Sequence, residues 1–142
     1  MIIVASVDSS PMATRVVDRA LEQARRLDGE VHVVHVYQPP ASMYALDAGF
    51  ALAAEDLASA EREAVWNALT SHLDASGVKW TKVDLSGHPA TQVSAYAEEV
   101  GADMIVIGTR GRGDLAALVL GSTSHGVIHS APCDVLVVRH VD

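Results

Sequence analysis

The sequence predicts an α/β fold, a doubly wound five-stranded parallel sheet in the order 3-2-1-4-5 with helices on both faces. Short, continuous apolar runs alternate along the chain with longer amphipathic segments, which is typical of βαβ units. The length of 142 residues fits one domain spanning residues 1–142. Hydrophobic residues make up 49% of the chain but aromatic residues only 4%, so the core is expected to be aliphatic.

Five apolar runs bounded by turn residues are predicted as strands. The first is a continuous run that ends at Asp8, as in a strand buried on both faces. The third is more polar, which favours a position at the edge of the sheet. The predicted strands are Ile2–Val7, Val31–Tyr37, Lys79–Leu85, Met104–Ile107 and Cys133–Arg139.

Four helices are predicted between these strands. The first follows Ser9, Ser10 and Pro11, because a serine N-cap with proline at the first helical position begins a helix. Asp28-Gly29 ends it. Residues 38–53 are expected to form a long connection to which no structure is assigned. The remaining predicted helices span Ala54 to about Ala75, Pro89–Val100 and Gly121 to about Ser130.

The predicted strand order locates a ligand-binding crevice. Right-handed crossovers restrict the topology, and this order reverses its winding between the first strand and the fourth. Ligands of such sheets bind beyond the carboxyl ends of the strands at that point. The crevice is therefore expected between Asp8, after the first strand, and Ile107-Gly108, at the end of the fourth. Asp8 has two interpretations there: it binds a ligand, or it caps the turn into the first helix.

The charge of the chain limits its partners. Ten basic residues against eighteen acidic ones give a formal net charge of −8. A nucleic acid or an anionic membrane surface would need a basic patch, and none is visible. An anionic ligand therefore has to be held locally, by backbone amides and a few arginines. A membrane span takes about 18 apolar residues, and neither such a stretch nor a signal peptide is expected.

Cys133 is the only cysteine. One thiol forms no disulfide framework, so a reducing compartment, the cytoplasm, is expected. Cys133 opens a predicted buried strand and has no basic neighbour in sequence, which favours an inert core thiol over a reactive one.

A glycine-rich segment joins the fourth strand to the last helix, with GTRGRG at 108–113 and GSTS at 121–124. Glycines let the backbone approach a ligand closely, successive N–H groups form an anion-binding nest, and a helix N-terminus presents free N–H groups to a phosphate. The serine hydroxyls and the arginines are expected to add hydrogen bonds. Alternatively, the glycines serve only turns of a surface loop. The segment lacks the lysine of a Walker A loop, and it follows the fourth strand rather than the first, unlike a Rossmann fingerprint.

In these residues the sequence resembles the universal stress protein family, specifically its ATP-binding branch. That branch carries the pattern G-x2-G-x9-G-[ST], which Gly108, Gly111, Gly121 and Ser122 match in full. The resemblance covers the whole chain, including the opening IIVASVDSS, the second strand VHVVHVY, the block GADMIVIGTRGRG and the closing APCDVLVVR. It implies a flavodoxin-like fold, a homodimer paired through the last strands, and ATP as the ligand.

The resemblance also implies which residues line the site. It places Asp8 beside the adenosine, Val36 against the adenine, and Ser6 and Val7 along the backbone stretch beside it. The glycine-rich segment is expected to contact phosphate and ribose. No catalytic residue and no protein metal ligand are expected. The expected nucleotide-binding residues are Ser6, Val7, Asp8, Val36, Ile107, Gly108, Gly111, Arg112, Gly113, Gly121, Ser122, Thr123 and Ser124.

Several histidines are candidates for additional sites. His125 and His129 stand four apart on the last predicted helix, a spacing that can chelate a metal, but no third ligand is evident, and solvent-facing or interface histidines are favoured. His32 and His35 have opposite side-chain parity in a strand and cannot form one site together. His88 precedes Pro89 and is either an N-cap or a neighbour of the crevice.

The function expected from these features is that of an ATP-binding stress-response protein, a sensor or regulator that acts through nucleotide occupancy. Mg²⁺ is expected to bridge the phosphates, because backbone groups alone do not neutralise a triphosphate. One alternative is a slow ATPase or autophosphorylating enzyme, which is disfavoured because no general base or Walker-type lysine is evident. The other is an interaction module that holds an adenylate. A receiver-type phospho-acceptor is excluded, because Leu85-Ser86-Gly87 ends the third predicted strand without an aspartate.

Overall fold

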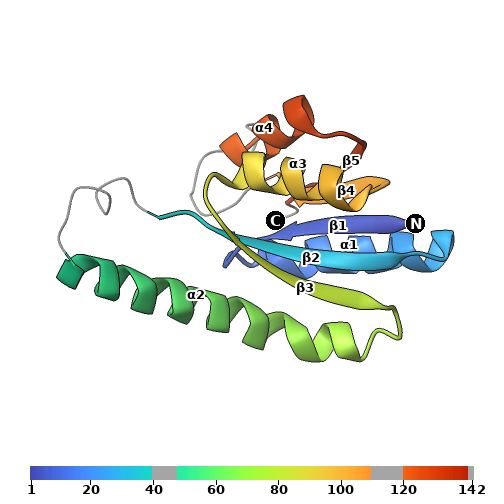
Figure 1. The fold of residues 1–142 in the computed structure, drawn as a ribbon. Helices are drawn as coiled ribbons and strands as arrows, with labels where there is room; N and C mark the ends of the chain where they lie inside the picture. Colours follow the sequence, from blue (N-terminus) through green and yellow to red (C-terminus); the bar gives the residue numbers. More distant parts are fainter. Residues whose placement is uncertain (40–47, 110–119, 141–142) are drawn as a thin grey trace.

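The computed structural model describes residues 1–39, 48–109 and 120–140. Within them the sheet has five parallel strands in the order β3-β2-β1-β4-β5, as predicted (Figure 1). The elements, in chain order, are β1 (Ile2–Val7), α1 (Met12–Leu27), β2 (Glu30–Tyr37), α2 (Ala48–Asp74), β3 (Trp80–Ser86), α3 (Pro89–Val100), β4 (Met104–Gly108), α4 (Ser122–Ser130) and β5 (Asp134–Val138).

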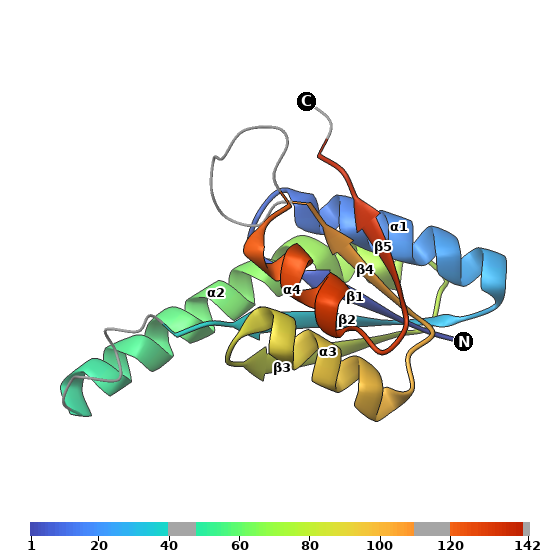
Figure 2. The same cartoon turned by 90° about the horizontal axis from the view of Figure 1, so that it is seen from above.

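Two helices cover each face of the sheet (Figures 1 and 2). Helices α1 and α2 pack on one face and α3 and α4 on the other, because right-handed crossovers change face when the direction of winding reverses. Each face has its own aliphatic core, as the composition predicts. Ile3, Val17 and Leu69 lie in the first core, and Val34, Val93 and Ile105 in the second.

The ends of the helices follow local backbone chemistry. At the start of α1, the Ser10 hydroxyl accepts the Met12 N–H at 3.3 Å and the Ser10 carbonyl accepts the Ala13 N–H at 3.2 Å. The end of α1 is at Asp28, which itself adopts the left-handed conformation with φ 50°. Helix α3 closes at Gly101 with φ 63°, the conformation that favours glycine after a helix.

The prediction for residues 38–53 was wrong over its last part, because α2 begins at Ala48 rather than at Ala54. The described side chains of Gly49–Ala53 are all exposed. They therefore present no buried face whose periodicity would mark a helix. Alanine and leucine have high intrinsic helix propensity, which explains how this part is helical without a packed face. None of the helices in the described ranges is long and apolar enough to cross a membrane.

Candidate functional site

The predicted crevice lies where the strand order reverses, between β1 and β4. Strand β1 lies between β2 and β4, and Ser6 pairs in register with Val34 on one side and Ile107 on the other. Because all these strands are parallel, Asp8 and Gly108 leave the sheet at the same edge. The tertiary structure therefore brings together two segments that are about a hundred positions apart in the sequence.

The side chains at this edge are divided between the two faces of the sheet. Ile107 and Val36 belong to the apolar cluster beneath α3 and α4. Ser6 shares this face by strand alternation with Val4. Val7 points to the opposite core and is 5% exposed. Val7 therefore offers only its backbone to the crevice, and its contact with a ligand stays a prediction.

The two ends of the glycine-rich segment meet at the end of β4. The Gly121 N–H donates to the Thr109 carbonyl at 2.8 Å, and the Thr109 N–H donates to the Val138 carbonyl at 2.9 Å. The chain thus leaves β4 and returns to the same point before α4 begins. Gly111, Arg112 and Gly113 lie outside the described residues, so their contribution stays a prediction.

The first turn of α4 opens at this edge with unpaired backbone donors. Gly121 is the N-cap residue, and no side chain caps the helix. The first helical hydrogen bond runs from the His125 N–H to the Gly121 carbonyl at 3.0 Å. The N–H groups of Ser122, Thr123 and Ser124 precede it and have no acceptor within the helix. Three donors and the positive end of a helix dipole form an arrangement suited to an anion.

Ser124 has a structural bond that the sequence did not reveal. Its side chain is 2% exposed, and its hydroxyl donates to the Gly108 carbonyl at 2.5 Å. The hydroxyl is therefore engaged within the protein, which argues against the direct phosphate contact expected of it, while the Ser124 backbone N–H remains in the open first turn. Ser122, by contrast, is an exposed residue at the start of α4.

Asp8 has the turn-capping role that was one of its two interpretations, and its ligand role stays a prediction. Its Oδ1 atom accepts the Ser10 N–H at 2.9 Å, which is the turn-capping role. This hydrogen bond engages only one of the two carboxylate oxygens of Asp8. The side chain is half-buried at the carboxyl end of β1, so Oδ2 is suited to accept a hydrogen bond from a hydroxyl group of a ligand.

Comparison with known proteins adds the family to this geometry. Residues 1–139 match the sequence model of the universal stress protein family. The chain belongs to this family. A universal stress protein of Methanocaldococcus jannaschii is 32% identical over 138 residues, which cover 96% of this chain and 81% of that relative.

Two solved universal stress proteins are similar to this chain in structure. The universal stress protein UspA from Lactobacillus plantarum has the same fold, with a TM-score of 0.87 over 98% of this chain and 97% of that chain, at 24% identity. A universal stress protein from Archaeoglobus fulgidus, solved in complex with dAMP, is 27% identical with a TM-score of 0.60 over 96% of this chain and 94% of that chain. The flavodoxin-like sheet implied by the resemblance is thereby confirmed.

The candidate histidines contact other side chains of the domain or lie exposed on its surface. His32 contacts Tyr96 on α3 at 2.8 Å, whereas His35 faces α2, so the predicted difference in parity is confirmed. His88 is the N-cap residue of α3, and its ring contacts the Thr91 hydroxyl at 3.2 Å. His125 and His129 are both exposed, with ring centres 4.7 Å apart, as favoured from the sequence.

Cys133 is half-buried just before β5. Burial raises the pKa of its thiol, and the nearby carboxylates of Asp134 and Asp103 raise it further. A raised pKa leaves little thiolate at neutral pH, which agrees with the prediction of an inert thiol.

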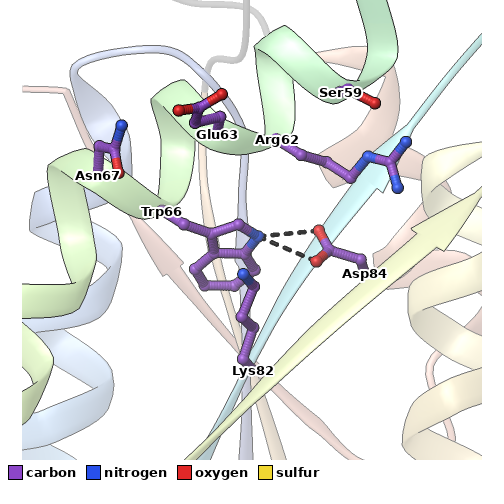
Figure 3. Close-up of a pocket in the computed structure, with 7 residues that line it drawn as sticks. All are labelled: Ser59, Arg62, Glu63, Trp66, Asn67, Lys82 and Asp84. Atoms are coloured by element: carbon purple, nitrogen blue, oxygen red, sulfur yellow. Dashed lines mark hydrogen bonds between the residues drawn. The ribbon is translucent and has the colours of Figure 1, made fainter. Parts of the chain in front are cut away.

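A second hollow, of about 360 Å³, lies between α2 and β3 on the other face of the sheet (Figure 3). Most of its charged groups already have partners within the chain. The Trp66 indole N–H donates to both Asp84 oxygens at 2.9 and 3.1 Å, and the Lys82 ammonium lies 4.9 Å from the centre of the Trp66 ring. Arg62 pairs with Glu55 at 3.0 Å. These pairings make the hollow less suited to an ionic ligand than the open turn of α4. Its lining residues are Ser59, Arg62, Glu63, Trp66, Asn67, Lys82 and Asp84.

A buried imidazole lies behind this hollow. His35 is 1% exposed, and its two ring nitrogens lie 3.4 Å from a Glu61 oxygen and 3.4 Å from an Asp84 oxygen. Among the described residues the Nδ1 atom has no hydrogen bond of good geometry, although an Asp84 oxygen lies 3.4 Å away. The series Glu61, His35, Asp84 and Trp66 links α2 to β2 and β3. Sequence reasoning missed it, because its members come from three separate elements.

Proposed function

We propose that this member of the universal stress protein family binds ATP in the crevice between β1 and β4, and acts as a sensor or regulator through nucleotide occupancy. The observation that carries the proposal is the open first turn of α4, held beside the end of β4 by the bond from Ser124 to Gly108. The dAMP complex of the Archaeoglobus fulgidus relative supports an adenine nucleotide as the ligand class.

Each part of a nucleotide has a chemically matched neighbour at this edge. Val36 and Ile107 offer an apolar surface to the adenine. The second carboxylate oxygen of Asp8 accepts a ribose hydroxyl. The N–H groups at the start of α4 hold phosphate oxygens. These N–H groups and the expected donors of Gly111, Arg112 and Gly113 neutralise only a small part of the triphosphate charge. A bound Mg²⁺ neutralises most of it.

The proposal extends to a homodimer formed through β5 in the cytoplasm. Strand β5 is an edge of the sheet, with Val135, Leu136 and Val137 only half-buried. An edge strand with unpaired backbone groups and apolar side chains is a ready surface for pairing with a second copy. The single cysteine agrees with a reducing compartment.

The test is titration calorimetry of nucleotide-stripped protein with ATP in the presence of Mg²⁺. Gly121 has φ −59° and ψ 159°, which valine also adopts, so Gly121→Val crowds the turn without straining it. We expect this variant to bind ATP at least about tenfold more weakly, and Thr81→Val, an exposed change on β3, to bind normally. Absence of ATP binding by the unaltered chain contradicts the proposal, and equal affinity of the two variants contradicts the proposed place.

Chromatography of the nucleotide released from freshly purified protein decides between ATP and another adenylate. Phosphate release above the background of Gly121→Val would add slow hydrolysis to binding. We expect no such excess, because the described residues at this edge include only one carboxylate, and Ser10 already engages it.

A further inference from the structure

The amino-terminal part of α2 extends beyond the sheet, at the same edge as the crevice (Figures 1 and 2). From Gly49 to Leu57 no described side chain is buried, and Ala58 is the first buried residue of the helix. At 1.5 Å per residue, Ala48–Leu57 spans about 15 Å. Helix α2 therefore presents to its surroundings a long surface that the described parts of the domain leave uncovered.

Apolar residues form a stripe along the exposed side of α2. They recur at spacings of three or four, on the side opposite the buried Val65, Leu69 and Leu73. Leu57 is 61% exposed and Phe50 54% exposed. We name this surface the α2 outer stripe. It consists of Phe50, Ala53, Leu57, Ala60, Ala64 and Ala68.

One border of the outer stripe is acidic. At about 100° per residue, Asp56 and Glu63 flank the stripe on the side away from Glu61, whose carboxylate contacts the buried His35 ring at 3.4 Å. Asp56 and Glu63 are exposed, and no cation in the described parts of the chain pairs with either carboxylate. Arg62, the nearest cation in sequence, points to the inner side of the helix and pairs with Glu55. The stripe thus has apolar residues at its centre and negative charge along the border formed by Asp56 and Glu63.

We propose that the α2 outer stripe docks an amphipathic helix of a partner protein that carries lysine or arginine beside its own apolar ridge. Spacings of three and four match the ridge of a second helix. Four alanines in the stripe allow the two backbones to approach closely. Basic side chains along the partner's ridge meet Asp56 and Glu63, which gives both attraction and a preferred register.

The acidic border disfavours two other occupants. If a second copy packed its outer stripe antiparallel against this one, Asp56 and Glu63 would face the same residues of that copy. Like charges at such positions are destabilising. An anionic membrane surface is repelled by the same border and by the net charge of −8.

The test uses a synthetic probe on the full chain. Two fluorescein-labelled peptides, each about three heptads long, share one leucine and alanine ridge and differ only in having lysine or glutamate beside it. Fluorescence anisotropy is expected to show at least about tenfold tighter binding of the lysine peptide. Leu57→Gln should weaken that binding, whereas Leu27→Gln, a matched change at an exposed leucine of α1, should not.

A charge exchange separates the stripe from general attraction to an acidic protein. The double variant Asp56→Lys with Glu63→Lys is expected to reverse the preference in favour of the glutamate peptide. Both side chains are exposed, so folding should persist, as circular dichroism would verify. Equal binding of the two peptides, or equal effects of Leu57→Gln and Leu27→Gln, overturns the proposal. A dimer in sedimentation velocity, or adsorption to phosphatidylcholine vesicles, that is abolished only by Leu57→Gln assigns the stripe to another occupant and also overturns it.

Discussion

The Ser124 hydroxyl donates a 2.5 Å hydrogen bond to the Gly108 carbonyl, and this bond joins the first turn of α4 to the end of β4. The glycine-rich segment runs between these two residues. The bond therefore positions the N–H donors of α4 relative to the edge of the sheet where Asp8 emerges. A residue that the family resemblance implies as a phosphate or ribose contact thus also holds the first turn of α4 in place.

Replacement of this serine should affect both stability and binding. Ser124→Ala leaves a buried carbonyl of Gly108 without its donor, so we expect the free energy of unfolding to fall by about 1–3 kcal/mol. ATP affinity should fall as well, because the turn loses its anchor. Urea unfolding and calorimetry measure the two effects. Ser122→Ala is the matched control, since its exposed hydroxyl leaves stability almost unchanged. A Ser124→Ala protein as stable as the control would show that the bond contributes little.

Two substitutions should separate the turn-capping role of Asp8 from its proposed ligand role. Asp8→Asn keeps an oxygen for the Ser10 N–H and should retain stability, whereas Asp8→Ala loses the turn and about 1 kcal/mol. Because a hydrogen bond to a charged group contributes about 1.5–3 kcal/mol, Asp8→Asn should bind ATP about tenfold more weakly. The difference should vanish with 2′,3′-dideoxy-ATP, which lacks the ribose hydroxyls. A loss of affinity of the same size for both nucleotides would show that Asp8 does not contact the ribose hydroxyls.

The indole of Trp66 should contribute more to stability than that of Trp80. Trp66 is 4% exposed and donates to Asp84, while the Trp80 indole donates to Asp74 at the surface, at 3.0 Å. Phenylalanine removes the donor and keeps an aromatic ring. We expect Trp66→Phe to lower the free energy of unfolding by about 1–3 kcal/mol, because it leaves a charged acceptor partly unsatisfied. Trp80→Phe should lower it by less, and equal losses in thermal or urea unfolding would contradict the importance of the link to Asp84.

Cys133 should react slowly with alkylating reagents. Its pKa is raised by burial and by Asp134 and Asp103, so less thiolate is present at pH 8 than in the unfolded chain. A raised folded pKa contributes stability that is present below the unfolded pKa and is lost as the pH rises through the folded pKa. Iodoacetamide labelling followed by mass spectrometry should be slower for the folded protein than in urea. Asp134→Asn should accelerate it and the remote Asp56→Asn should not, whereas labelling as fast as in urea would contradict the raised pKa.

The order of strands and helices was predictable because it follows from local composition. Strand β1 is a short apolar run, and α3 starts at Pro89 and ends before Gly101, so each element is marked by the residues in it or next to it. The family and its glycine pattern were also predictable from the sequence, since Gly108, Gly121 and Ser122 stand at fixed spacings along the chain. These are properties of neighbouring residues, and a sequence records them directly.

The tertiary structure alone decided which of these groups are free. The resemblance implied Ser124 as a phosphate or ribose contact, and the structure shows that the end of β4 engages its hydroxyl. His35 is held between Glu61 and Asp84, which come from two other elements. The start of α2 was missed because Gly49–Ala53 contains no polar residue among its apolar ones, so no helical period marks this stretch. Sequence by itself determined the fold, the family and the candidate donors of the glycine-rich segment. Only the packing of distant segments decided their availability, because a hydrogen-bonding group is free or occupied according to what folds against it.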